Sequence, residues 1–265
     1  MAWELGDGLD FYNAVADMTA GGTAWSSVSG GGFVAAANTR FGVGQGFSVP
    51  GNGAGSLVTQ TFGNDTTIYV NFTWTYPGTL PNNTTAYFGI APRDTTNTQV
   101  GIYMRGDGSI IVTNGAFNGT ILATWTGVFA GNVWNHYQFK IVINNTTGSV
   151  ELRLNGATSD TQSLTGVNTR NGSANSYANN ISIFGNAANT YFDDFYVFND
   201  QGAQPMDSEL RQQQLLAGVR SSRRWRHHLR FHQHDKQRRS LRHGGSFNDA
   251  ERDHQRSAKE LHPYG

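Results

Sequence analysis

The 265-residue chain contains no cysteine, so disulfides and thiolate metal sites are excluded and its stability has to come from packing. No apolar run reaches the roughly 20 residues needed to cross a bilayer, so no membrane partner is expected. The first residues have neither a basic nor an apolar signal region. The sequence therefore predicts assembly in the cytoplasm, without export through a signal peptide.

Charge is also scarce, at 14% of residues, whereas glycine is abundant with 33 residues and 37% of the chain is hydrophobic. This combination is typical of short strands that are joined by tight turns and bury one face. None of the glycine clusters continues into Gly-Lys-Ser/Thr or opens a helical pattern. A phosphate-binding loop is therefore not expected.

The clearest strand pattern lies between Trp134 and Gly156. Apolar and polar residues alternate, a polar turn follows at Asn144–Gly148, and the alternation then resumes. We predict a β-hairpin with one buried face and one solvated face, on which Glu151 pairs with Lys140. The apolar face consists of Tyr137, Phe139, Ile141, Ile143, Val150, Leu152 and Leu154.

Other runs of the same kind predict an all-β fold, a two-sheet antiparallel sandwich of the jelly-roll type with about a dozen strands. Arg105-Gly-Asp-Gly108 between two of these runs is a natural turn sequence, and we prefer this interpretation to an integrin-type adhesion motif. The runs cover residues 68–76, 86–91, 99–104, 109–113, 119–126, 181–184 and 191–198, with shorter ones at 3–12, around Trp25, at 33–37 and at 56–62.

The composition changes abruptly near Gln204. Residues 1–204 carry 6 Lys+Arg against 12 Asp+Glu, whereas residues 205–265 carry 13 against 7 and seven of the eight histidines. We predict a β-sandwich over 1–204 and a basic tail over 205–265 that is partly helical or disordered, with out-of-frame translation as one hypothesis. Nucleic-acid binding or metal chelation by the tail is possible in principle, but a solvated basic segment is preferred.

The hairpin, followed by Tyr-Phe-Asp-Asp-Phe-Tyr-Val-Phe198, resembles the concanavalin A-like lectin/glucanase superfamily, particularly its laminin G-like branch. The opening segment Gly6–Tyr12 is similar to the start of laminin G-like proteins encoded by bacteriophages and prophages. The resemblance covers roughly residues 3–200. It implies a concanavalin A-like sandwich in which the last strand pairs with the first.

The resemblance also implies a calcium site, because laminin G-like domains often hold Ca²⁺ with paired acids. The candidate ligands are Asp193 and Asp194 on the last strand, with Asp7 and Asp10 near the first. Adjacent strand residues are expected to point to opposite faces, so Asp193 and Asp194 would not share a site through their side chains alone. The alternative is that one of them binds backbone at the strand edge.

For sugar binding, the useful groups are aromatic and polar side chains on a solvated face. Alternation places five such candidates away from the core: Tyr87, Tyr103, Arg105, His136 and Gln138.

Catalysis is not expected, because glucanases of this superfamily carry acids at alternate positions of one strand. Residues 1–204 contain only two glutamates, Glu4 and Glu151, and no Glu-x-Asp-x-Glu pattern. We predict a noncatalytic phage virion protein (a capsid decoration, tail or attachment component) that forms homo-oligomers and binds other virion proteins or a cell-surface glycan. A cellular carbohydrate-binding module and a divergent polysaccharide-cleaving enzyme are the alternatives.

Overall fold

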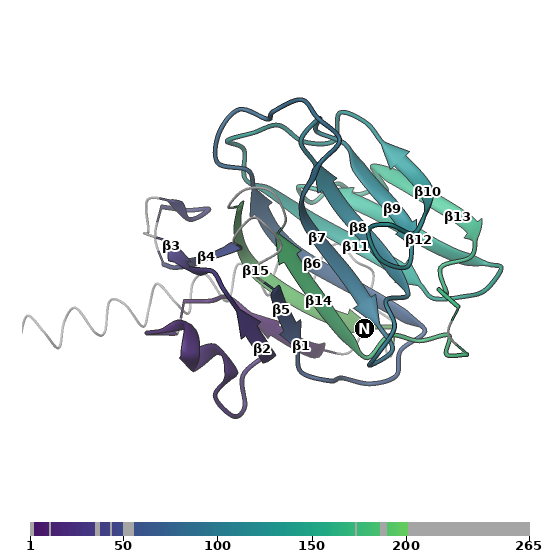
Figure 1. Cartoon of the computed structure of the whole chain (residues 1–265), viewed down its shortest axis with the longest axis horizontal. Helices are drawn as coiled ribbons and strands as arrows, with labels where there is room; N and C mark the ends of the chain where they lie inside the picture. Colours follow the sequence, from purple (N-terminus) through teal and green to yellow (C-terminus); the bar gives the residue numbers. More distant parts are fainter. Residues whose placement is uncertain are drawn as a thin grey trace, which may run out of the picture. The chain divides into compact units, whose positions relative to one another are not determined.

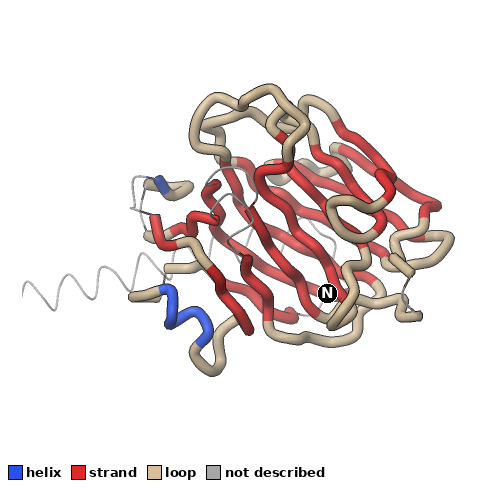
Figure 2. Tube along the Cα trace, in the orientation of Figure 1, coloured by secondary structure: helices blue, strands red, loops and turns tan. Residues whose placement is uncertain are grey.

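Almost all regular structure in the part of the chain that we describe is β-strand (Figure 2). The exceptions are 3-10 helical: η1 (Val15–Thr19) and a single residue, Asn38. None of the described helices is long and apolar enough to span a membrane. The computed structural model describes residues 3–10, 12–34, 38–42, 44–49, 56–172, 174–185 and 190–200.

The described strands form two antiparallel sheets that face each other as a sandwich (Figure 1). The first, sheet A, has eight strands within the described ranges, and β1 pairs with β15 beside the main path. Its order is β13 (Gln162–Val167), β12 (Gly148–Leu154), β11 (Asn135–Val142), β6 (Thr67–Thr75), β15 (Thr190–Asn199), β4 (Gly46–Val49) and β3 (Gly32–Val34), with β1 (Trp3–Asp7) as the eighth.

The second, sheet B, has seven strands in the same described part of the chain. Its order is β10 (Thr120–Trp125), β9 (Ile110–Asn114), β8 (Val100–Arg105), β7 (Ala86–Arg93), β14 (Asn180–Gly185), β5 (Ser56–Thr59) and β2 (Trp25–Ser29). The expected all-β, two-sheet antiparallel sandwich is thereby confirmed.

Aromatic rings from both sheets fill the space between them. Phe72 on β6 lies 5.3 Å from the ring of Tyr137 on β11 and 5.5 Å from Phe88 on the opposite sheet, measured between centroids. Phe192 on β15 contacts Phe88 at 5.8 Å. Each fully buried aromatic side chain of this kind stabilises the fold by about 2–3 kcal/mol through burial, and ring pairs add roughly 0.5–1.5 kcal/mol.

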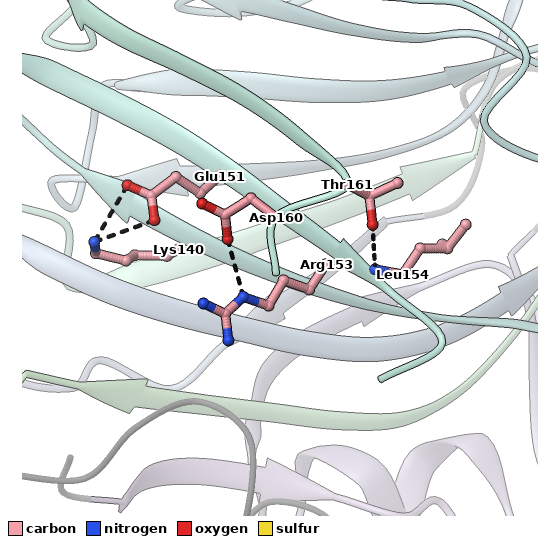
Figure 3. A network of polar contacts seen from close by, with 6 residues as sticks. All are labelled: Lys140, Glu151, Arg153, Leu154, Asp160 and Thr161. Atoms are coloured by element: carbon pink, nitrogen blue, oxygen red, sulfur yellow. Dashed lines mark hydrogen bonds and ion pairs between the residues drawn. The ribbon is translucent and has the colours of Figure 1, made fainter. Parts of the chain in front are cut away.

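The predicted hairpin is present as β11 and β12, paired in register from Tyr137 opposite Leu154 to Val142 opposite Ser149. The inward residues Tyr137, Phe139 and Ile141 are completely buried. On the polar side Lys140 lies directly opposite Glu151, with 3.2 Å between Nζ and Oε2, so the predicted cross-strand ion pair is also confirmed (Figure 3).

Three elements have no counterpart in the sequence predictions: η1, β4 and β13. The last of these is an edge strand whose residues are all at least partly exposed, so it needs no apolar alternation and shows none. β4 begins at Gly46, the last residue of a glycine-rich stretch that starts at Gly42 and shows no strand alternation.

Three of the sequence predictions lie partly or wholly outside the described residues. They are the boundary between residues 204 and 205, the character of the basic tail, and the second part of the strand expected at 33–37. The frameshift hypothesis likewise remains a prediction.

Candidate functional site

The last strand, β15, changes its edge partner half-way along. Residues Thr190–Phe192 pair with β4, whereas Phe195–Phe198 pair with β1. The register with β6 shifts between Asp193 and Tyr196, and Asp194 has a φ of 53°. An inserted residue in the left-handed conformation is the signature of a β-bulge, and aspartate tolerates this conformation better than most residues.

The bulge changes how the two acids are placed. Phe192 and Phe195 are both buried in the core, although strict alternation would put them on opposite faces. Alternation was the basis for expecting Asp193 and Asp194 to point apart, and it does not hold here because the bulge adds a residue. The Asp194 amide instead donates to Oδ1 of Asp193 over 2.8 Å.

Two loops bring further charged groups to the bulge. Nη1 of Arg40 lies 3.6 Å from Oδ2 of Asp194. The backbone N–H of Gln45 donates to Oδ1 of Asp10 over 2.7 Å. Gly44 packs so closely on the Asp10 carboxylate that a Cβ would overlap it, and its φ is +78°, so this position requires glycine. The Arg40 guanidinium therefore lies beside Asp194, and its charge also acts on Asp193.

These carboxyl groups raise one another's pKa. Burial, followed by the charges of Asp194 and Asp10, raises the pKa of Asp193 to about 9, against the opposing effect of Arg40. Burial and Asp10 also raise the pKa of Asp194, while Arg40 lowers it. The raised pKa of Asp193 favours its protonated form.

Tyr196 lies near enough to these acids for their charges to act on its hydroxyl. Burial and the charges of Asp194, Asp193, Asp7 and Asp10 raise the pKa of Tyr196 above its usual range. The structure therefore brings together the four acids that the sequence proposed as one group, around a neutral phenol.

Asp7 has a structural role within this group. Its Oδ1 accepts from the Leu9 amide over 2.7 Å, and its Oδ2 accepts from the hydroxyl of Tyr12 and from Nε1 of Trp25. Trp25 is completely buried. Asp7 thus satisfies donors that would otherwise be buried without partners.

The residues fit a calcium ion poorly. Both oxygens of Asp7 already accept hydrogen bonds, and within the described ranges no three His, Asp or Glu side chains are arranged to hold a metal together. Calcium needs six to eight oxygen ligands, usually with several carboxylates. Asp7 therefore binds donors of the protein itself, and the described acids around it do not by themselves supply the ligand set of a calcium ion.

An exposed aromatic ring lies beside the acids. Phe41 is 71% exposed, and the guanidinium carbon of Arg40 lies 4.8 Å from its ring centroid. Arg40 therefore links this ring to Asp194. We call Asp10, Arg40, Phe41, Asp193 and Asp194 the bulge site. Sequence reasoning missed Arg40 and Phe41, because they lie in a loop where no periodicity marks them.

Tyr103, expected to be exposed for sugar binding, is only 1% exposed. Its ring lies over Gly89 and Gly101, where a Cβ would overlap it, and it contacts the rings of Phe117 and Phe184. Alternation correctly turned Tyr103 away from the main core. Glycine neighbours on the outer face of sheet B, however, let the ring lie flat and become buried in a second small apolar cluster.

The other two proposed sugar contacts on sheet B, Tyr87 and Arg105, also bind neighbouring residues of the chain. Tyr87 is buried edge-on against Tyr76, and its hydroxyl accepts from Nδ2 of Asn83 over 3.2 Å. Arg105 pairs with Asp107 of its own turn, with 3.0 Å between Nη2 and Oδ2. The Arg-Gly-Asp sequence thus stabilises the β8–β9 turn, as we expected for a turn sequence.

His136 and Gln138 face away from the core on sheet A, yet both are buried. Their strand lies between β12 and β6, so neighbours flank them on both sides: Gln138 lies between Arg153 and Asn71. The more open polar groups of this face are the pairs in Figure 3, including Arg153 with Asp160 at 2.9 Å. The five proposed sugar contacts are thus divided between two sheets and do not form one exposed patch.

Comparison with known proteins supports the fold. No protein-family model and no curated protein matches the sequence. The solved carbohydrate recognition domain of Emp46p, in its metal-free form, is 11% identical, with 75% of this chain and 98% of that domain covered and a TM-score of 0.50. At this identity the likeness shows the fold alone, and it confirms the expected concanavalin A-like sandwich.

Two further solved structures are more distant. The exoplasmic/lumenal domain of VIP36 in its Ca²⁺/Man-bound form is 11% identical, with 70% of this chain and 86% of that one covered and a TM-score of 0.47. The receptor-binding domain of botulinum neurotoxin type G is 14% identical, with 66% and 42% covered and a TM-score of 0.42.

Proposed function

We propose that the chain is a noncatalytic carbohydrate-binding domain whose contact surface is the bulge site. The observation that carries this proposal is the exposed ring of Phe41 next to Arg40 and Asp194. A pyranose presents an apolar face that stacks on an aromatic ring, while its hydroxyls need donors and acceptors at the rim. The bulge site supplies both within one set of contacting residues.

The polar groups of the bulge site suit sugar hydroxyls. The Arg40 guanidinium is a donor, and the carboxyl oxygens of Asp194 and Asp10 are acceptors. A hydroxyl group both donates and accepts, so a pair of vicinal hydroxyls matches such a mixed set. The likeness to the Emp46p carbohydrate recognition domain supports a fold on which this function is found, without placing a ligand.

The second candidate is the divergent polysaccharide-cleaving enzyme, favoured by one observation: Asp193 with a raised pKa lies next to Asp194. A general acid beside a second carboxylate is the usual glycosidase arrangement. Here, however, the Asp193 carboxyl is buried and its Oδ1 binds the Asp194 amide. Because consecutive residues cannot flank a glycosidic bond from both sides, we prefer binding.

We further propose that the domain is part of a phage or prophage virion, as a decoration, tail or attachment component, present in several copies. What supports this is the similarity of the opening segment Gly6–Tyr12 to laminin G-like proteins of phages. A cellular carbohydrate-binding module would use the same site. Capsid or tail genes beside the encoding gene would favour the virion, and their absence would favour the cellular module.

The experiment is a glycan array with the full chain and two variants, followed by titration of the best ligand. Phe41→Ala should weaken binding by about tenfold, equivalent to about 1.4 kcal/mol of lost stacking. Phe117→Ala is the matched control, because Phe117 is also an exposed phenylalanine, at 42%, but lies in the turn between β9 and β10 of sheet B. Its affinity should equal that of the wild type.

Equal weakening by the two phenylalanine variants, or no glycan bound by the wild type, would overturn the assignment of the site. Release of reducing sugar from the bound polysaccharide, abolished in Asp193→Asn, would establish the enzyme in its place.

A further inference from the structure

One edge of the sandwich is formed by a strand without any charge. β10 is the last strand of sheet B, and no strand among the described residues pairs with its outer side. An edge strand has a row of backbone N–H and C=O groups that can pair with another strand. Natural edge strands are usually protected by a charged side chain, a proline or a bulge. β10 has a register shift between Ile121 and Ala123, but neither of the other two.

The uncharged stretch extends well beyond this strand. Residues 108–139 contain no Asp, Glu, Lys or Arg, although 14% of the whole chain is charged. Within the described residues, three of the four exposed large apolar side chains fall in this stretch: Phe117, Ile121 and Val133. Ile121 lies on β10 itself and is 56% exposed. An exposed apolar side chain on an open, uncharged edge is typical of the central part of a protein interface.

The charges of the domain indicate which partner fits this edge. Residues 1–204 carry 6 Lys+Arg against 12 Asp+Glu, so two copies of the domain repel each other wherever their acids meet. In a two-fold contact a patch meets itself, so any charge in it would lie close to an identical charge. The uncharged β10 avoids this repulsion, whereas a partner of another kind is usually recognised through complementary charge. The edge therefore fits a second copy of this chain.

We propose that two copies of the chain associate through β10, which pairs antiparallel with the same strand of the second copy. An antiparallel pair of identical strands is related by a two-fold axis, so no second kind of surface is needed. Sheet B then continues across both copies, and Ile121 of each copy lies at the contact. Pairing of one short strand makes a small interface, so a Kd of about 1–100 µM is expected.

The contact leaves the bulge site free. β10 lies on the side of the sandwich where β13 ends sheet A, whereas the bulge site lies towards the opposite side, where β15 pairs with β4 (Figure 1). A dimer therefore carries two bulge sites away from its interface. One consequence rests on the proposed function: if the bulge site binds glycan, two sites on one dimer increase the avidity for a surface that bears many copies of the ligand. The dimer itself does not depend on glycan binding.

The test measures the mass of the full chain by sedimentation equilibrium over concentrations that span this Kd. The wild type should change from one chain of 28.9 kDa to a dimer as the concentration rises. Ile121→Lys should raise the Kd at least about tenfold, because it places two like charges at the contact. Val133→Lys is the matched control, since Val133 is exposed to a similar extent, at 46%, but precedes β11. Its Kd should equal that of the wild type.

A mixture of variants tests the two-fold symmetry. Ile121→Glu alone should also dissociate the dimer, whereas an equimolar mixture of Ile121→Lys and Ile121→Glu should form dimers again, because opposite charges then meet. Amide hydrogen exchange of the wild type gives a further readout that does not depend on the folding of any variant. Exchange in β10 should become slower as the concentration rises, and exchange in the opposite edge strand β2 should not change.

The proposal is overturned if the wild type remains monomeric at the highest concentration, or if Ile121→Lys and Val133→Lys change the Kd equally. Protection that rises with concentration in another strand, and not in β10, would overturn it as well. Failure of the proposed function is measured separately. Phe41→Ala should remain dimeric, and Ile121→Lys should keep the wild-type affinity for a soluble glycan in titration, so each idea can fail without the other.

Discussion

Replacement of the buried Asp7 by alanine should be among the most destabilising changes in sheet A. The carboxylate accepts three hydrogen bonds, from the Leu9 amide, the Tyr12 hydroxyl and Nε1 of Trp25. Leu9 and Trp25 are completely buried, so their N–H groups would lose a charged acceptor with no water to replace it. Each such loss costs roughly 1–3 kcal/mol. Tyr12 is only partly buried and can bind water instead.

We therefore expect Asp7→Ala to lower the free energy of unfolding by about 3–5 kcal/mol, measured by urea denaturation. Asp7→Asn is the matched control, because it keeps the shape and one acceptor oxygen. It should lose only about 1–3 kcal/mol. The two losses should be the same with calcium and with chelator, since both oxygens act as hydrogen-bond acceptors.

The reasoning would be refuted by a loss below about 1 kcal/mol for Asp7→Ala, which would mean that the donors find other partners. It would equally be refuted by a loss that occurs only when calcium is present. That outcome would restore Asp7 as the metal ligand proposed from the sequence.

Three further predictions concern stability. The pKa of Asp193 is raised in the folded state, so the folded state keeps a proton that the unfolded state loses above the ordinary pKa of 3.8. The free energy of unfolding should therefore fall as the pH rises towards about 9, by at most about 1.4 kcal/mol per pH unit. Urea midpoints measured at several pH values should depend less on pH in Asp193→Asn than in the wild type, and an equal dependence would contradict this. A double-mutant cycle of Lys140→Ala and Glu151→Ala should give a coupling of about 0.5–1 kcal/mol, because the pair is only half-buried, and a coupling of zero would contradict it. Gly89→Ala should lower the free energy of unfolding by about 1–3 kcal/mol, because the new Cβ would overlap the aromatic rings on the outer face of sheet B. Gly21 has open space around it, so Gly21→Ala should leave the free energy of unfolding unchanged. Equal losses in the two variants would refute the overlap.

The sandwich could be predicted from the sequence because its central strands bury one face and solvate the other. Phe139 and Leu152, for example, are buried where the alternation places them, and Lys140 meets Glu151 on the opposite side. Edge strands such as β13 escape this reasoning, since all residues of β13 are at least partly exposed and Leu164 alone among them packs against the core.

The solvent exposure of a side chain was harder to predict than the face of the sheet to which it points. Alternation turned Tyr103 and Gln138 away from the main core correctly, but it says nothing about what lies beside them. Tyr103 is buried because Gly89 and Gly101 leave room for its ring, and Gln138 is buried because its strand is flanked on both sides. Both effects depend on neighbours that are distant in sequence or belong to other strands.

The bulge on β15 did leave a signal in the sequence. Phe195 comes three positions after Phe192, and Val197 comes two positions after Phe195, so these buried residues can share a face only if one extra residue is inserted between the first two. The inserted position falls at the paired acids, where β15 leaves β4 and joins β1. A regular strand would have turned one of two adjacent acids into the core, at the cost of a buried charge. The bulge avoids that cost, and the same irregularity creates the cluster of carboxyl groups to which we assign ligand binding.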